Sequence, residues 1–183
     1  LGVQVPVVRD RDDAPAALRQ AVETVLERRM ADAVLRAVGD LFAGPLHSLL
    51  RYLLLHAETP LNPDDVARSQ HCHSKTLRAR LRAAGLPSLN RLIIWTRLLR
   101  AAHHVATSGR PLEQVAVAMD FPSAAALRTQ LQRYTGMAAH ELRAPGAVDR
   151  LLDRFRREAA PPASPVEVSR RRGAKHRGHA LAA

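Results

Sequence analysis

The sequence of 183 residues is poor in cysteine, in aromatic residues and in long apolar stretches. Cys72 is the only cysteine, which excludes an intrachain disulfide and a cysteine-rich zinc site and favours a reducing compartment, the cytoplasm. Aromatic residues make up 3% of the chain, so a core must be built from leucine, valine and alanine, which favours small packed helices. Uncharged apolar stretches such as 92–95 and 115–119 are far shorter than the ~20 residues that span a bilayer. We therefore expect no membrane-spanning segment.

Sequence motifs of known catalytic chemistry are absent as well. The chain has no nucleophile elbow, glycine-rich phosphate cradle, paired acidic motif or HExxH sequence. We expect no enzymatic activity and no cofactor. His71, Cys72 and His73 are soft enough to bind zinc, but they fall in one tight turn and no fourth ligand is spaced to close the site. A small hydrophobic role for Cys72 is favoured over a metal site or a reactive, alkyl-accepting cysteine.

Acidic residues are too few to balance the basic ones. Lys+Arg number 28 and Asp+Glu 17, for a net charge of +11. Only Lys75 and Lys175 are lysines, so nearly all the positive charge is arginine, whose planar guanidinium suits phosphate and guanine edges. Residues 61–143 carry 12 basic and 5 acidic side chains, and residues 156–183 carry 7 and 2. This excess indicates a polyanionic partner, either nucleic acid or an anionic membrane surface.

Residues 1–45 predict a strand followed by a helix. The β-branched run at 3–8 fits one strand, and an apolar pattern that opens at Pro15 and continues to Val34 fits a helix. We interpret this segment as the truncated end of an α/β domain, with a helical lead-in as the alternative, and place the boundary at Gly44-Pro45. The first residue is Leu rather than Met, so we expect a sensor domain further upstream.

Several short helices follow from Leu46 onward. Leucines at helical spacing predict one helix over 46–55, and Asn62 before Pro63 is a strong signature for the start of the next. A further helix is expected from His73 or Ser74 to Gly85, and a longer one from Ser88 to about Ala106.

The second half of this region repeats the first. Val115-Ala116 begins like Val66-Ala67, and Leu127 and Leu131 take the places of Leu77 and Leu81. A short helix, a tight turn and a second helix, present twice, predict an all-α fold with two helix-turn-helix subdomains joined by a long linker helix. That linker, ~18 residues or ~27 Å long, brings the two units near the ~34 Å repeat of B-DNA, so one chain can reach two successive major grooves.

The outward face of each second helix supplies the candidate DNA-binding residues. With the two leucines inward, Ser74, Lys75 and Arg78 face outward in the first unit to read base edges, and Arg82 reaches phosphate. In the second unit alanines occupy two of the corresponding positions. We therefore expect this unit to strengthen binding and to fix the alignment of the protein on DNA more than to read the sequence. Its candidate residues are Ser123, Arg128, Thr129, Gln132 and Arg133.

These motifs resemble a known family. The segments Leu61-Asn62-Pro63-Asp64-Asp65-Val66-Ala67, Thr76-Leu77, Arg97-Leu98-Leu99-Arg100-Ala101, Val115 to Ser123, and Gly136-Met137 to Leu142-Arg143 are similar to the DNA-binding domain of AraC/XylS transcription regulators. The resemblance covers residues 46–143. It implies seven helices, two helix-turn-helix units, binding to double-stranded promoter DNA, and an effector bound by a separate domain, here missing upstream. RNA polymerase is a further candidate partner, and we expect no membrane association.

The chain departs from this family at several positions. The usual Leu, Ser, Gly and Pro are replaced by Gln70, His73, Asp120 and Ala139, and Leu127 and Leu131 replace two core phenylalanines. A degenerate helix-turn-helix domain that serves as a protein–protein interaction module is therefore the alternative function. Residues 144–183 are expected to form a short helix and a basic, disordered tail with the arginine run 170–172.

Overall fold

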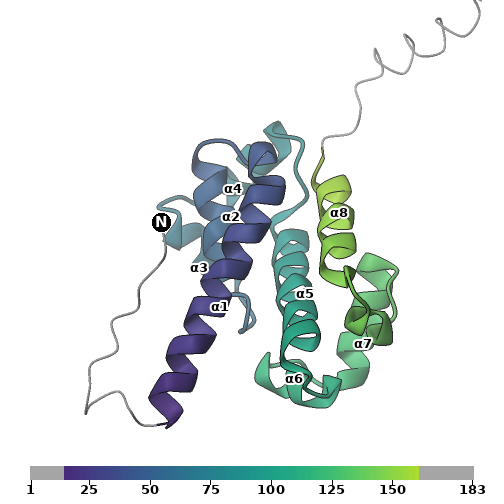
Figure 1. Cartoon of the computed structure of the whole chain (residues 1–183). Helices are drawn as coiled ribbons and strands as arrows, with labels where there is room; N and C mark the ends of the chain where they lie inside the picture. The colour runs from purple at the N-terminus through teal and green to yellow at the C-terminus, as the bar shows by residue number, and fades with distance from the viewer. Residues whose placement is uncertain (1–14, 161–183) are drawn as a thin grey trace, which may run out of the picture.

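The computed structural model describes residues 15–160, and this part of the chain is entirely helical (Figure 1). The predicted all-α fold is confirmed, whereas the strand expected at 3–8 lies outside the described residues. The helices are α1 Pro15–Val38, η1 Gly39–Leu41, α2 Pro45–Leu55, α3 Pro63–Ser69, α4 Ser74–Ala83, α5 Leu89–Ser108, α6 Leu112–Ala118, α7 Ala124–Thr135, η2 Ala139–Arg143 and α8 Ala147–Ala159, where η1 and η2 are 3-10 helices.

Helix α5 runs through the centre of the molecule and contacts α2, α4, α6, α7, α8 and η2 (Figure 1). It begins where the Ser88 hydroxyl oxygen accepts a hydrogen bond from the Arg91 amide, and it ends at Gly109 in the left-handed conformation. Leu89, Leu92 and Leu99 are buried, as their helical spacing predicts. The long linker helix expected from Ser88 to Ala106 is therefore present, and both helix pairs are attached to it.

The start of α3 follows the capping signature in the sequence. The side-chain oxygen of Asn62 accepts a hydrogen bond from the Asp64 amide at 2.9 Å, and Pro63 occupies the first helical position. This satisfies one of the free N–H groups of the first turn, while proline has no N–H to satisfy.

The C-terminal half of α1 belongs to the same core as the rest of the molecule. Val38 and Phe42 are buried against the cluster that also contains Leu49, and α1 packs on α2 and α8. The Phe42 ring lies 6.5 Å from that of Phe155 in α8. Packing is thus continuous across Gly44-Pro45, the predicted boundary. The assignment of residues 1–45 to a truncated α/β domain stays a prediction.

The C-terminal helix α8 closes over α5. Its buried face carries Leu151, Phe155 and Ala159, and the Phe155 ring lies 5.4 Å from the indole of Trp95 in α5. On its other side the Arg156 guanidinium forms hydrogen bonds to both carboxylate oxygens of Asp40, at 2.9 and 2.7 Å. This ion pair holds the pKa of Asp40 below its usual value and raises that of Arg156. The predicted basic tail from 161 onward lies outside the described residues.

None of the helices within residues 15–160 combines the length and the apolar character needed to cross a bilayer.

Candidate nucleic-acid interface

The two short helix pairs, α3–α4 and α6–α7, turn in the same way. In the first turn the Cys72 amide donates a hydrogen bond to the Ala67 carbonyl at 3.1 Å, and in the second the Phe121 amide donates to the Ala116 carbonyl at 2.8 Å. His71 and Asp120, one in each turn, both have a φ of 51°, in the left-handed region. Asp and His adopt this region more readily than most residues with a Cβ. The duplication predicted from the sequence is therefore confirmed in the backbone.

Helix α4 presents a row of free cationic side chains. Leu77 and Leu81 are buried, as predicted, while Lys75, Arg78 and Arg82 are exposed. The helix carries no acidic residue, and none of these three side chains forms a hydrogen bond or ion pair with any residue between 15 and 160. Arg78 and Arg82 line a groove of about 410 Å³ where α4 meets the start of α5. Their guanidinium groups are thus available to an external partner.

The N-termini of α4 and α7 differ. His73 precedes α4 and gives no side-chain hydrogen bond to it, and the predicted site residue Ser74 is half-buried in its first turn. Ser123 precedes α7, and its hydroxyl oxygen accepts a hydrogen bond from the Ala126 amide at 3.1 Å. The structure therefore uses Ser123 to cap α7, whereas the first amides of α4 have no side-chain acceptor.

The predicted polar residues of α7 lie on its surface, but part of them is already engaged. The Arg128 guanidinium is 2.7 Å from the Glu113 carboxylate in α6, and the Thr129 hydroxyl donates to the Ala125 carbonyl at 2.9 Å. Gln132 is exposed with no hydrogen-bond partner in the described part of the chain, and the exposed Arg133 guanidinium lies 5.7 Å from the Tyr134 ring centre. The second unit therefore offers less free positive charge than the first.

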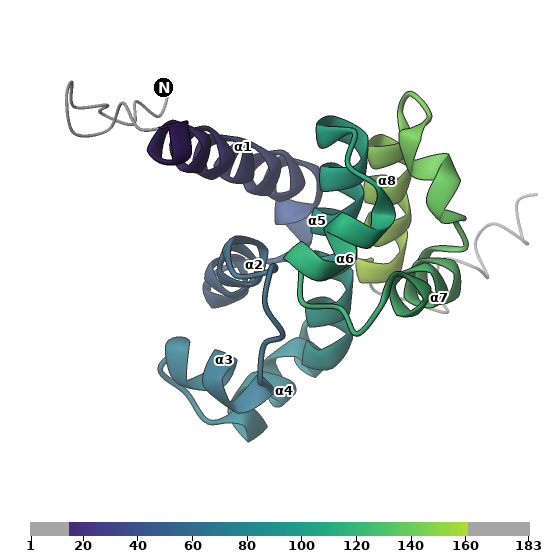
Figure 2. The same ribbon diagram turned by 90° about the horizontal axis from the view of Figure 1, so that it is seen from below.

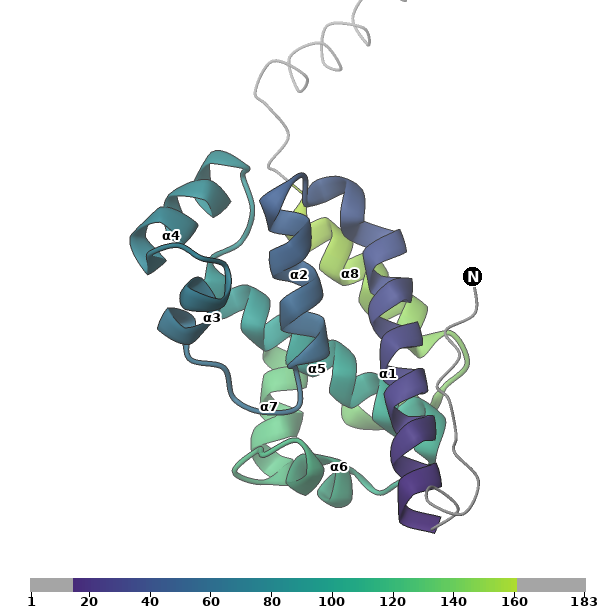
Figure 3. The ribbon, with the colours of Figure 1, turned by 90° about the vertical axis from the view of Figure 1, so that its left-hand side faces the viewer.

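The two charged helices lie on the same side of the molecule. Figure 3 shows α4 and α7 on the left-hand side and α1 on the right, and Figure 2 places α1 on the side opposite α4. The α3–α4 pair lies at the start of α5 and α6 follows its end. The 20 residues of α5 span about 30 Å at a rise of ~1.5 Å per residue. The nine predicted site residues therefore belong to two separate helix pairs, α3–α4 and α6–α7, whose second helices lie on the same side of the molecule.

Arg97 of α5 holds the turn between α6 and α7 against α5. Its guanidinium donates hydrogen bonds to the carbonyls of Met119 and Asp120, and it lies 4.3 Å above the ring centre of Phe121. Burial lowers the pKa of Arg97 from its usual value. This role of Arg97 could not be predicted from the sequence, because its partners lie more than twenty residues away.

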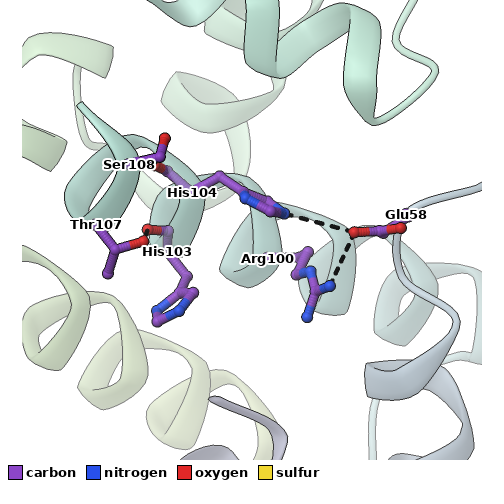
Figure 4. A network of polar contacts seen from close by, with 6 residues as sticks. All are labelled: Glu58, Arg100, His103, His104, Thr107 and Ser108. Carbon is purple, nitrogen blue, oxygen red and sulfur yellow. Dashed lines mark hydrogen bonds and ion pairs between the residues drawn. The ribbon is translucent and has the colours of Figure 1, made fainter. Parts of the chain in front are cut away.

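A polar network joins α5 to the loop after α2 (Figure 4). The side chain of Arg100 is only 2% exposed, and it donates a hydrogen bond to Glu58 at 2.8 Å. The His104 Nε2 atom lies 3.6 Å from the same carboxylate oxygen. Burial lowers the pKa of His103 and of His104, and the positive charge of Arg100 acts in the same direction. Both imidazoles are half-buried, and their lowered pKa values favour the neutral form.

The turn 71–73 contains no ligand set. Cys72 is half-buried and packs against the core, while His71 and His73 are exposed. Within the residues that the structure describes, no group of three or more His, Cys, Asp or Glu side chains is placed to hold a metal ion.

No protein-family model matches the chain, and no curated protein matches it significantly. The function of the surface formed by α4 and α7 is therefore inferred from its geometry and charge.

Proposed function

We propose that the chain is a sequence-specific transcription regulator that inserts α4 and α7 into two successive major grooves of double-stranded DNA. The observation that carries this proposal is the pair of exposed, arginine-bearing helices on one side of a central helix. The central helix α5 is itself about 30 Å long, a length of the same order as the 34–36 Å between major grooves one helical turn apart. Both units can then engage one face of a duplex.

The two helix-turn-helix units contribute differently to DNA binding. Arg78, Lys75 and Ser74 lie on the first turns of α4, where side chains of a helix in the major groove meet base edges, and Arg82 lies one turn further along, towards phosphate. In α7, two alanines occupy the base-facing positions and can contact only a thymine methyl group. The second unit therefore supplies backbone contacts from Arg128, Gln132 and Arg133 and sets the register.

The resemblance of residues 46–143 to AraC/XylS regulators supports the same function. It adds the expectations that RNA polymerase is a partner, that an effector binds a domain upstream, and that the protein acts in the cytoplasm without a cofactor or catalytic activity. Six α-helices and the 3-10 helix η2 in this region match the seven helices that the family implies.

Selection from a randomised duplex library tests the proposal directly. We expect a bipartite site with two half-sites one helical turn apart, and a log–log salt slope of about −4.5 to −7, as for neutralisation of ~5 to 8 phosphates. Enrichment of no sequence, together with a flat salt dependence, would contradict it.

A protein-interaction module is the second candidate. The observation that favours it is Val117, an apolar side chain on α6 that is 80% exposed. Stable capture of a protein partner that Val117→Ser abolishes, with no dependence of DNA binding on duplex length, would establish this alternative.

A further inference from the structure

The C-terminal end of α7 is bonded to a helix outside both helix-turn-helix units. The Arg154 guanidinium of α8 donates a hydrogen bond to the carbonyl of Thr135, the last residue of α7. No backbone amide within residues 15–160 donates to this carbonyl, as is usual in the last turn of a helix. A guanidinium there supplies a donor and places a positive charge at the negative end of the helix dipole. Arg154 therefore caps α7.

Gly136 makes room for this guanidinium. It follows α7 with a φ of 62°, and a Cβ placed on it would lie 2.8 Å from the Arg154 Nη1 atom. Because that atom is the far end of a flexible side chain, a larger residue would push the guanidinium away, and it would also strain the backbone. The hydrogen bond from Arg154 to the end of α7 therefore depends on glycine.

Helix α8 is itself fixed on the core beside α5 (Figure 1). Phe155 is buried, and its ring lies 5.4 Å from the indole of Trp95 in α5. The next residue, Arg156, forms hydrogen bonds to both carboxylate oxygens of Asp40, which follows α1. Arg154 therefore extends from a backbone that is anchored on two other helical elements. The helix lies beyond residues 46–143, so the resemblance to AraC/XylS regulators implies nothing about it.

A second contact joins the last turn of α7 to α5 and α8. The Arg91 guanidinium of α5 lies 5.2 Å from the ring centre of Tyr134 in α7, and the same arginine pairs with Glu158 of α8. The three helices thus meet at the end of α7, where Arg154 supplies the hydrogen bond to its backbone.

The two ends of α7 are held by arginines from different helices. Arg97 of α5 donates to the turn that precedes α7, and Arg154 of α8 donates to its last residue. Neither α5 nor α8 carries any of the nine predicted DNA-binding residues. Arg128 and Gln132 lie on the surface of α7 between these two attachments. Because a helix moves as a stiff unit, release of one end would tilt α7 and shift both side chains.

We propose that Arg154 is a positioning residue that holds α7 in the orientation in which it binds its half-site on DNA. This inference rests on the proposed function. Arg154 bonds to the backbone of α7, so it acts by fixing where the side chains of α7 point rather than by touching DNA. Helix α4 receives no hydrogen bond from α8 within the described part of the chain, so binding at its half-site should not depend on Arg154.

Binding of the full chain to two duplexes tests this inference. One duplex carries the complete bipartite site from the library selection. The other ends after the half-site of α4, which is the half-site whose sequence preference Arg78→Ala relaxes. Arg154→Ala should raise the Kd for the complete site about three- to tenfold, because it removes a hydrogen bond that holds α7. Its Kd for the short duplex should stay within about twofold of the wild type. Equal losses on both duplexes, as a general loss of folded protein would give, would overturn the proposal.

Arg157→Ala is the matched control. It removes the same charge from α8 three residues further along, but Arg157 is exposed and bonds to no residue within 15–160. Both duplexes should bind this variant within about twofold of the wild type. A loss on the complete site equal to that of Arg154→Ala would count against the proposal, because it would reflect net charge alone.

Gly136→Ala displaces the Arg154 guanidinium without removing its charge. It should weaken binding to the complete site as Arg154→Ala does and leave the short duplex unaffected. In the double variant Gly136→Ala/Arg154→Ala the guanidinium is already gone, so we expect no further loss beyond about twofold. Fully additive losses would contradict the proposal, because the two residues would then act on α7 separately.

The wild type separates a failure of this inference from a failure of the proposed function. If the wild type binds the complete site no more tightly than the short duplex, α7 does not engage DNA and the proposed function itself is wrong. If the wild type prefers the complete site and Arg154→Ala keeps that preference unchanged, only the role of Arg154 is refuted.

Discussion

The carboxylate of Glu113 and the guanidinium of Arg128 lie 2.7 Å apart and tie α6 to α7 on the surface of the second helix-turn-helix unit. Both side chains are more than half exposed, so this ion pair contributes little to stability. On the proposed function we expect a larger effect on binding, because the pair places a negative charge beside the only arginine in the first half of α7. In the first unit the corresponding helix α3 carries Asp64 and Asp65, but Asp65 pairs with Arg68 of the same helix and not with α4.

Removal of this acid should strengthen DNA binding. Glu113→Gln frees Arg128 and removes repulsion of phosphate, so we expect the Kd for duplex DNA to fall about two- to fivefold at low salt, as for an ion pair worth up to ~1 kcal/mol. Fluorescence anisotropy with a labelled duplex measures this. Asp149→Asn removes the same charge from α8 and should have a smaller effect. Equal gains in the two variants would mean that only net charge matters.

Alanine substitutions of Arg78 and Arg82 should weaken DNA binding in different ways. Arg78→Ala removes a base contact, so we expect relaxed preference at one position of the selected site and a loss of about 1–3 kcal/mol on the preferred sequence. Arg82→Ala should weaken all duplexes alike and reduce the salt slope by about one. Library selection and salt titrations of both variants check this. The assignment is wrong if both variants weaken every duplex equally.

Arg97 should control the second unit without touching DNA. Arg97→Met keeps the apolar stem over Phe121 but loses the hydrogen bonds to the turn, so the free energy of unfolding should fall by about 1–2 kcal/mol, allowing for a half-buried site. Footprinting should show protection of one half-site and loss of the other. Arg68→Met, which removes an exposed ion pair with Asp65, should cost less than about 0.5 kcal/mol and leave both half-sites protected. Symmetric weakening of the two half-sites by Arg97→Met would argue against this role.

Stability should depend on pH near the histidine pKa. Burial lowers the pKa of His103 and His104 below their ordinary 6.5, so the unfolded chain takes up protons first as the pH falls. The free energy of unfolding should therefore be constant above about pH 6.5 and decline below it. Urea unfolding between pH 8 and pH 5.5 measures this decline, and the double variant His103→Asn/His104→Asn should flatten it. Asp40 titrates at lower pH and does not contribute in this window. An unchanged decline in the double variant would assign it to other groups.

The parts of the fold that the sequence predicts well are those set by neighbouring residues. Asn62 and Pro63 start a helix through contacts within one turn, and the spacing of Leu77 and Leu81 fixes which face of α4 is buried. The candidate residues of α4 could be placed on the surface for the same reason, because the exposed face follows once the buried one is known.

The contacts that escaped prediction join distant elements. Arg100 looks like a solvent-facing charge in the sequence, yet it is buried beside Glu58, 42 positions earlier. Arg97 and Arg128 likewise have partners on other helices, and the periodicity of one helix carries no information about them. The role of α1 was also hidden, since its apolar pattern predicts a helix but not that this helix packs on α2 and α8.

The packing of Phe42 and Val38 determines how this protein can be divided. A fragment that begins at Pro45 would lack Phe42, whose ring stacks on that of Phe155, and would expose the apolar side of α2. Chimaeras and fragments made from this protein should therefore keep α1 together with the segment 46–143, because the core continues across Pro45 into the C-terminal half of this helix.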